Sequence, residues 1–282
     1  MNSIPLDPDA VEAIQVDAVA IENAVAAIVP GADIDADLRL AVSCMDLTTL
    51  QGDDTEDRVR ALCTRARSPL ANDPVLTTAA VCVYHAMVPT ALEALNGTDI
   101  PVAAVSAGFP HGLSPLSTRI AEIEASVAAG AQEIDIVIRR GHALKGNWQA
   151  LYDEVAAFRT ACGSAHMKAI LATGELGDAT TIARASYVCM AAGADFIKTS
   201  TGQEKVNATL PAGAVMMRAI RSFHAQTGRH VGFKPAGGIA TADQALQWIA
   251  LVRQELGNVW LKPELFRFGA SRLLDDIAGR LA

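Results

Sequence analysis

The chain has 282 residues, of which 51% are apolar and 19% are charged. This composition is typical of a globular protein with a large core and excludes a disordered chain. The net charge of −8 argues against a surface that binds nucleic acid or an anionic membrane.

Short apolar runs alternate with longer amphipathic stretches along the chain. We predict strands at 41–45, 79–84, 101–107, 133–138, 167–172, 194–199, 230–235 and 265–269. We predict helices after them at 55–67, 88–96, 117–129, 148–161, 179–192, 211–225, 241–256 and 270–281. Strands that are apolar along almost their whole length are typical of a parallel sheet buried on both faces.

Eight strand–helix units predict an α/β fold, a TIM (β/α)8 barrel. The alternative is a doubly wound open sheet, which we favour less because no GxGxxG motif follows the first strand. Residues 8–29 predict one extra helix packed against the barrel. We therefore divide the chain into an N-terminal helical extension at 1–38 and a catalytic barrel at 39–282.

Targeting and membrane segments are not expected. The N-terminal sequence has no basic segment followed by an apolar core, so we expect no signal peptide. No apolar run has the roughly 18–20 residues that a membrane span needs. The five cysteines contain no CxxC pair, which predicts reduced thiols and a cytoplasmic location.

Charged residues lie within several of the predicted strands or at their ends, where barrel enzymes carry their catalytic groups. A single strand-end lysine is more often a solvated tip or half of a structural ion pair. An aspartate between isoleucines, as in EIDIVI, needs a buried partner. Five such groups with complementary charges favour a functional cluster: Asp46, Asp135, Lys168, Lys198 and Lys234.

Two of these lysines end the neighbouring sixth and seventh strands, Lys198 in FIKTSTG and Lys234 in VGFKPAGG. A free lysine amine is protonated at neutral pH and is not a nucleophile. A neighbouring ammonium group and partial desolvation both favour the neutral amine. One lysine could therefore attack a carbonyl to form a Schiff base, and the other could supply the perturbing charge.

Glycine-rich segments follow the last two strands, AGG at 236–238 and GAS at 269–271. These loops form the usual phosphate site of a TIM barrel, although each could be only a tight turn. No HxH or HExxH motif is present around His85, His111 or elsewhere, so we expect no metal. Cys82 could be core packing or a thiol that touches substrate.

Nine motifs together resemble the deoxyribose-phosphate aldolase family in order and spacing, over about residues 41–275. They are DLTTL, AAVCVY, GFPHG, EIDIVI, TGEL, ADFIKTSTG, VNAT, GFKPAGG and FGAS. The resemblance implies a metal-free class I aldolase, a lyase on a TIM barrel. Its reaction would be the reversible cleavage of 2-deoxy-D-ribose 5-phosphate to acetaldehyde and D-glyceraldehyde 3-phosphate, with no cofactor.

The family's residue roles carry over by motif. Lys198 would form the Schiff base, Lys234 would lower its pKa, and Asp135 would transfer protons. The remaining implied substrate-binding residues are Asp46, Cys82, Lys168, Thr201, Gly202, Gly237, Gly238, Gly269 and Ser271.

Two positions depart from the family pattern. Gln203 stands where relatives usually carry a phosphate-binding lysine, and Arg272 stands where they tend to carry a small hydroxyl residue. We expect Arg272 to replace the missing lysine at the phosphate, with Lys205 as the next candidate and a solvent-facing Arg272 as the alternative.

Small phosphorylated sugars and aldehydes are the expected partners, and we expect a homo-oligomer. Three other functions remain open: a Schiff-base aldolase with a different acceptor, a phosphosugar isomerase that uses Asp135 as its base, and a catalytically silent sugar-phosphate binder.

Overall fold

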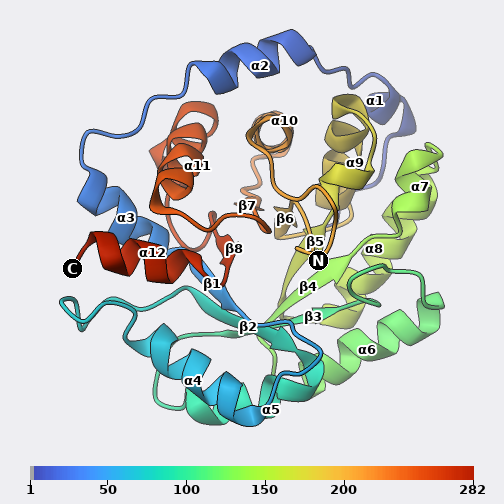
Figure 1. The fold of residues 1–282 in the computed structure, drawn as a ribbon. Coiled ribbons are helices and arrows are strands. Elements are labelled where there is room, and N and C mark those ends of the chain that lie inside the picture. Colours follow the sequence, from blue (N-terminus) through green and yellow to red (C-terminus); the bar gives the residue numbers. More distant parts are fainter. Residues whose placement is uncertain (1–2) are drawn as a thin grey trace.

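The computed structural model describes residues 3–282, and a single eight-stranded parallel sheet forms its centre (Figure 1). The strands follow one another around the sheet in chain order, with β1 and β8 as neighbours. Their bounds are β1 Met45–Thr48, β2 Ala80–Tyr84, β3 Val102–Ser106, β4 Glu133–Val137, β5 His166–Ile170, β6 Phe196–Lys198, β7 Gly232–Lys234 and β8 Phe268–Ala270.

Backbone hydrogen bonds between the seventh and eighth strand regions close the barrel. The N–H of Arg267 donates to the carbonyl of Phe233 at 3.1 Å, and the N–H of Gly269 donates to that of Pro235 at 2.9 Å. Closure removes free sheet edges and brings all the strand C-terminal ends to one mouth. The predicted TIM barrel is confirmed.

Helices surround the strands as an outer ring (Figure 1). Their starts follow ordinary capping chemistry: Asp178 accepts the N–H of Thr181, and Thr241 forms a reciprocal capping box with Gln244. The ring contains α4 Glu56–Arg67, α5 Val88–Ala94, α6 Leu116–Ala128, α7 Arg140–Leu144, α8 Trp148–Cys162, α9 Ala179–Ala191, α10 Leu210–Thr227, α11 Ala242–Glu255 and α12 Leu273–Arg280.

The first strand was placed too early by the sequence. Helix α3, Ile34–Ser43, occupies most of the predicted 41–45 run, and β1 begins at Met45. Buried Leu38, Ala41 and Val42 are spaced i, i+3 and i+4, which is a helical stripe. The residues AVS of the predicted run AVSCM therefore end a helix, Cys44 caps it, and only Met45 belongs to the strand.

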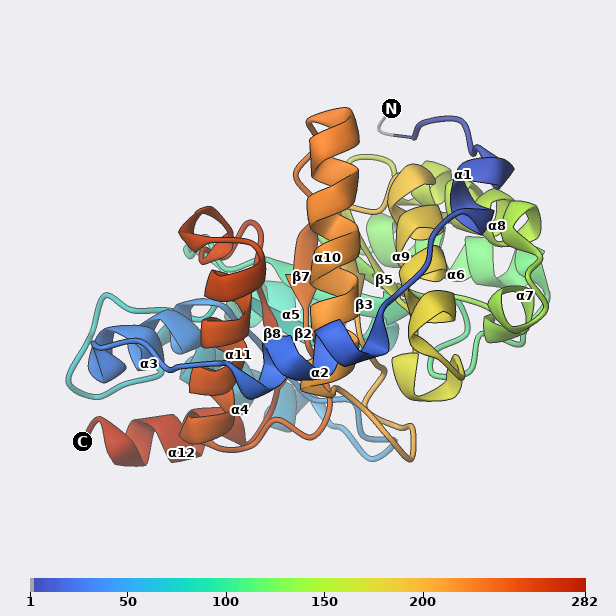
Figure 2. The ribbon, with the colours of Figure 1, turned by 90° about the horizontal axis from the view of Figure 1, so that it is seen from above.

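The N-terminal extension contains two short helices, α1 Pro8–Glu12 and α2 Ala18–Ala26, so the prediction of one helix over 8–29 was wrong. The helices are separate because Asp7 caps the first and Asp17 caps the second, each accepting backbone N–H groups. Figure 2 shows the extension running along the outside of the ring, past α9, α10 and α11. The division at residues 38/39 falls inside α3 and stays a prediction.

Side-chain hydrogen bonds hold the extension to the barrel. The carboxylate of Glu12 accepts from Trp148 Nε1 at 2.8 Å and from Arg184 Nη1 at 2.6 Å. The hydroxyl of Tyr152 donates to the carbonyl of Ile4 at 2.8 Å. Across the described part of the chain, no helix combines the length and apolarity required to cross a bilayer.

Candidate active site

The parallel register of the barrel places charged residues beside one another on neighbouring strands. Asp135 on β4 lies opposite Lys168 on β5, and Lys198 on β6 lies opposite Lys234 on β7. All four are at least 97% buried, so their charges can be satisfied only by one another and by other buried groups. Asp46, predicted at the end of the first strand, instead lies inside β1 and is also buried.

Asp135 is the centre of this cluster because it accepts hydrogen bonds from three lysines. Its Oδ2 accepts from Lys198 Nζ at 2.7 Å and from Lys234 Nζ at 2.7 Å. Its Oδ1 accepts from Lys168 Nζ at 2.9 Å. The buried partner expected for an aspartate between isoleucines is therefore a set of three ammonium groups.

Asp46 holds a second side of the cluster. Its Oδ2 lies 2.5 Å from Lys234 Nζ and 3.5 Å from Lys168 Nζ. Its Oδ1 accepts from Arg267 Nη1 at 2.6 Å. Lys234 thus contacts two carboxylates, whereas the described contacts of Lys198 include only the carboxylate of Asp135.

Two members of the cluster were not predicted from the sequence, Glu133 and Arg267. Arg267 Nη2 donates to Glu133 Oε1 at 2.8 Å, and Lys168 Nζ donates to Glu133 Oε2 at 2.5 Å. Both residues are buried: Glu133 is 4% exposed and Arg267 is 5% exposed. A signal was present, because Glu133 lies two residues before Asp135 on the same strand face and Arg267 stands between two phenylalanines.

Lys198 differs from the other lysines in its protonation. Burial lowers the pKa of Lys198 most, Asp135 opposes that change, and the nearby charge of Lys234 lowers the pKa further, so the result lies below the ordinary value. A lowered pKa increases the fraction of neutral amine that can act as a nucleophile.

The neighbouring groups are held in their charged forms. Burial alone would lower the pKa of Lys168 and of Lys234, but the adjacent carboxylates outweigh it and raise both. Burial opposes ionisation of Asp46 and Asp135, yet the surrounding cations depress the pKa of each. The site therefore combines one amine that releases its proton readily with charged neighbours that do not.

A cavity of about 480 Å³ opens at the barrel mouth above Lys198. Most of the residues predicted to bind substrate line it, which brings the β6, β7 and β8 loops together. The lining residues from the sequence prediction are Lys198, Thr201, Gly202, Gly237, Gly238, Gly269, Ser271 and Arg272. Thr48 at the end of β1 and Thr49, Leu50 and Gln51 after it also line the cavity.

The other predicted residues are buried and do not line this cavity. Asp46, Asp135, Lys168 and Lys234 lie behind Lys198 in the hydrogen-bonded cluster. Cys82 is fully buried in a small apolar group with Leu50, Ala103 and Val105, separate from the main core. Burial raises the pKa of the Cys82 thiol, as does the charge of Asp135, so the thiol stays neutral within this apolar group.

Backbone conformation at the mouth requires glycine at two predicted positions. Gly237 and Gly238 have φ values of +82° and +81°, a region that side chains disfavour. A Cβ on Gly237 would also lie 2.7 Å from the side chain of Asn207. The two glycines therefore let the loop after β7 adopt this backbone conformation without strain.

The positions that depart from the family pattern lie at the rim. Gln203 and Arg272 both line the cavity and are exposed, and Lys205 is exposed without lining it. Arg272 is the N-cap residue of α12 and not part of its first turn, and its side chain makes no capping hydrogen bond. Glu204, which the sequence did not single out, is buried and accepts the N–H groups of Thr201 and Gly202.

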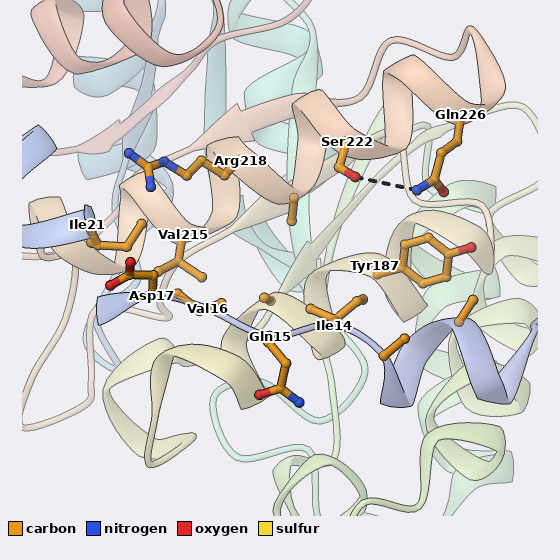
Figure 3. Close-up of a pocket in the computed structure, with 14 residues that line it drawn as sticks. Ile14, Gln15, Val16, Asp17, Ile21, Tyr187, Val215, Arg218, Ser222 and Gln226 are labelled. Atoms are coloured by element: carbon orange, nitrogen blue, oxygen red, sulfur yellow. Dashed lines mark hydrogen bonds between the residues drawn. The ribbon is translucent and has the colours of Figure 1, made fainter. Parts of the chain in front are cut away.

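A second cavity, of about 380 Å³, lies between the extension, α9 and α10 (Figure 3). Its two charged lining residues already have partners: Asp17 caps α2, and Arg218 pairs with Glu255. Gln226 donates to Ser222 at 3.4 Å across one turn of α10. This space is therefore a packing feature at the edge of the extension, away from the lysine cluster.

Within residues 3–282, no group of three or more His, Cys, Asp or Glu side chains is arranged to hold a metal ion.

Comparison with known proteins agrees with this geometry. The sequence model of the DeoC/LacD family aldolases matches residues 40–276. The chain is 56% identical over 248 residues to a protein of Homo sapiens called deoxyribose-phosphate aldolase, covering 84% of this chain and 78% of the human one. A Bos taurus protein of the same name is 55% identical over the same shares.

Solved structures share the fold at lower sequence identity. A crystal structure from Coccidioides immitis has a TM-score of 0.75 at 23% identity and covers 100% of both chains. A deoxyribose phosphate aldolase from Aeropyrum pernix, described as a tetramer, has a TM-score of 0.66 at 23% identity and covers 89% of this chain and 97% of its own. Since the sequence model matches residues 40–276 and two relatives are 55–56% identical over 84% of the chain, the chain belongs to the DeoC/LacD family of aldolases.

Proposed function

We propose that this lyase reversibly cleaves 2-deoxy-D-ribose 5-phosphate into acetaldehyde and D-glyceraldehyde 3-phosphate through an imine on Lys198. The observation that carries the proposal is the position of the Lys198 amine. It lines the mouth cavity, its pKa is lowered, and it donates to Asp135 at 2.7 Å. The names of the human and bovine relatives supply the substrate.

The covalent half of the reaction begins when neutral Lys198 adds to the aldehyde carbon of the open-chain sugar. Asp135, which lies against the Nζ atom, would relay the protons that turn the carbinolamine hydroxyl into a leaving water. Lys168, at 2.9 Å from the other oxygen of Asp135, would hold that carboxylate in place and restore its charge. The product is an iminium ion on Lys198.

The iminium ion then accepts the electron pair of the breaking carbon–carbon bond. The C3 hydroxyl loses its proton, C3 becomes the aldehyde of glyceraldehyde 3-phosphate, and C1 and C2 remain on the lysine as an enamine. Protonation of C2 and addition of water then release acetaldehyde and return the free amine. The proton taken at C3 and the proton given to C2 balance over one turnover.

The phosphate would bind at the glycine-lined side of the cavity, as the resemblance implied. Gly202, Gly237, Gly238, Gly269 and Ser271 lie together there, and α12 begins two residues after Ser271. Backbone N–H groups and a helix N-terminus favour an anion at such a place. The exposed guanidinium of Arg272 would add charge that Gln203 cannot supply.

The same proposal assigns the electron-sink role to the lysine imine, with no metal or organic cofactor. Activity should therefore survive dialysis against a chelator, which would abolish the activity of a metal-dependent aldolase.

Reductive trapping tests the covalent intermediate. Borohydride added with acetaldehyde should fix a two-carbon adduct on Lys198 and inactivate the enzyme, because reduction turns an imine into a stable amine. Peptide mapping by mass spectrometry locates the adduct, and Lys205→Arg serves as a control because Lys205 is exposed outside the cavity. An adduct on another lysine, or none in an enzyme that turns over the sugar, contradicts the proposal.

We also propose that the enzyme is a cytoplasmic homo-oligomer. The five cysteines are all buried free thiols, which fits a reducing compartment. The tetramer named for the Aeropyrum pernix protein suggests an assembled state. Light scattering of the purified enzyme would give the number of subunits.

A further inference from the structure

We propose that Arg267 and Glu133 are positioning residues that set the protonation of Lys198 by fixing the net charge of the buried cluster. The inference rests on the proposed role of Lys198 as the imine-forming residue. Neither Arg267 nor Glu133 lines the mouth cavity, so both act through other residues and not on the substrate.

The cluster contains one more cation than it has carboxylates. The cations are Lys168, Lys198, Lys234 and Arg267, and the carboxylates are Asp46, Glu133 and Asp135. An excess charge in a buried site is costly because little water reaches it. Loss of one proton from one lysine makes the cluster neutral.

Arg267 cannot release that proton, because a guanidinium stays charged in proteins. It also occupies the oxygens that could otherwise hold lysines. Nη1 lies 2.6 Å from Asp46 Oδ1, and Nη2 lies 2.8 Å from Glu133 Oε1. By taking these acceptors, Arg267 leaves the three lysines to compete for what remains.

The lysines have unequal shares of the carboxylates. Lys168 contacts three, at 2.5, 2.9 and 3.5 Å, and Lys234 contacts two, at 2.5 and 2.7 Å. Lys198 pairs with Asp135 alone among the described residues, and Asp135 is shared with both other lysines. Lys198 is therefore the lysine for which loss of the proton costs least.

The charged and titratable groups around Lys198 come from almost every strand. β3 contributes none, since its sequence is VAAVS, and Arg272 is the charged residue on the rim above. The groups on the other strands and beside β8 are Asp46, Cys82, Glu133, Asp135, Lys168, Lys234 and Arg267.

Opposite substitutions should move the protonation of Lys198 in opposite directions. Arg267→Met removes a positive charge and frees Asp46 and Glu133, so the protonated form of Lys198 is favoured. The acidic limb of the kcat/KM profile, which reports the free enzyme, should then move to a pH higher by about one. Glu133→Gln removes a negative charge, so the same limb should move to lower pH.

Two further variants control for packing. Arg267→Lys keeps the charge but loses the planar guanidinium group. The acidic limb of its kcat/KM profile should therefore stay close to that of the wild type, even if its rate falls. In the double variant Arg267→Met/Glu133→Gln the two charge changes cancel, so the limb should return towards the wild-type position. If Arg267→Met alone does not fold, Glu133→Gln, Arg267→Lys and the double variant still decide the question.

The pH profile is measured both by turnover and by the rate of borohydride trapping of acetaldehyde at Lys198. The inference would be overturned if the acidic limb moved in the same direction for Arg267→Met and Glu133→Gln, or if their rates fell while the limb did not move. Arg267 and Glu133 would then be packing residues. Trapping at Lys198 in the wild type with unmoved limbs in the variants defeats only this inference. Absence of trapping at Lys198 in the wild type defeats the proposed function itself.

Discussion

Asp135 accepts a hydrogen bond from each of three lysines, and its two oxygens divide them unevenly. Lys198 and Lys234 share Oδ2, both at 2.7 Å, whereas Lys168 uses Oδ1. Two ammonium groups on one oxygen atom lie close enough to repel each other, and the carboxylate stabilises each less than it would stabilise one alone. Burial does most to lower the pKa of Lys198, and the repulsion from Lys234 on the shared oxygen lowers it further.

Replacement of Lys234 by methionine tests that repulsion. Lys234→Met removes the positive charge that lowers the pKa of Lys198 and leaves Asp135 Oδ2 to Lys198 alone, so the pKa of Lys198 should rise. The group must be neutral to react, so its reactivity is lost as the pH falls through a higher pKa, and the acidic limb of kcat/KM moves to higher pH. If the limb moves by about one in pH, the fraction of neutral amine below the limb falls roughly tenfold.

Lys205→Met is the matched control for that experiment, because Lys205 is exposed and does not line the cavity. Its profile should coincide with that of the wild type. If the acidic limb of the kcat/KM profile does not move in Lys234→Met and the activity is nearly normal, Lys234 is only a structural ion-pair partner of Asp46.

Single residues of the cluster could be predicted from the sequence where a charged side chain lies in an apolar strand. Asp135 between isoleucines and Lys198 after FI stand out in that way. Arg267 between phenylalanines carries the same signal, but it lies in a short run near the end of the chain, where one charge is weak evidence of a buried partner. What sequence alone could not supply is the partner list, since each hydrogen bond of Asp135 joins residues at least 33 positions apart.

Among the elements, the second to eighth strands lie within or overlap the predicted runs, whereas the first strand and the segment before it were misplaced. The eight strand–helix repeats give a strong alternating pattern, and the strands are mostly apolar runs. Ala41 and Val42 are also apolar, yet they belong to α3, which has an earlier buried apolar residue at Leu38. A short apolar run cannot be assigned to helix or strand without the residues that precede it.

The loop between β8 and α12 carries the substitution most relevant to substrate binding. Arg272→Ala should lower kcat/KM for deoxyribose 5-phosphate severalfold, because a charge-assisted contact to the phosphate would be lost. Turnover of unphosphorylated deoxyribose should hardly change. Steady-state kinetics with both sugars measures the difference.

Arg280→Ala provides the control on the same helix, since Arg280 is exposed at the far end and pairs with Asp243. It should affect neither substrate. Equal losses on both sugars in Arg272→Ala, or no loss on either, would show that Arg272 does not replace the family lysine at Gln203.

For the molecule as a whole, the barrel and the extension differ in how firmly they are held. The described helices of the extension each bury one side chain, Val11 in α1 and Ile21 in α2. The barrel strands, in contrast, are closed by hydrogen bonds into a ring. Segments with few buried apolar contacts open locally at lower cost than the core does.

Ile21→Ala should therefore loosen the extension before the barrel unfolds. Removal of a buried isoleucine side chain costs about 2–5 kcal/mol where the space does not collapse. Limited proteolysis should cleave near residues 13–30 sooner than in the wild type, whereas kcat/KM is unchanged because α2 packs on the outside of α10. Val19→Ala, a change of the same kind at a side chain that is 64% exposed, should have no effect.

A fall in the thermal unfolding temperature of the whole enzyme, with no earlier cleavage of the extension, would contradict this expectation. It would mean that the extension and the barrel unfold as one cooperative unit.

The burial difference between the lysine cluster and the rim of its cavity bears on how new aldehyde acceptors could be accommodated. The lysine cluster is buried and joined by shared carboxylates, with only Lys198 reaching the cavity, so substitutions there disturb several ion pairs at once. Gln203, Gly238 and Arg272 are exposed and touch the cavity from separate loops. Natural divergence and laboratory selection can therefore alter the acceptor at the rim, while the amine proposed to react and its proposed proton relay stay unchanged.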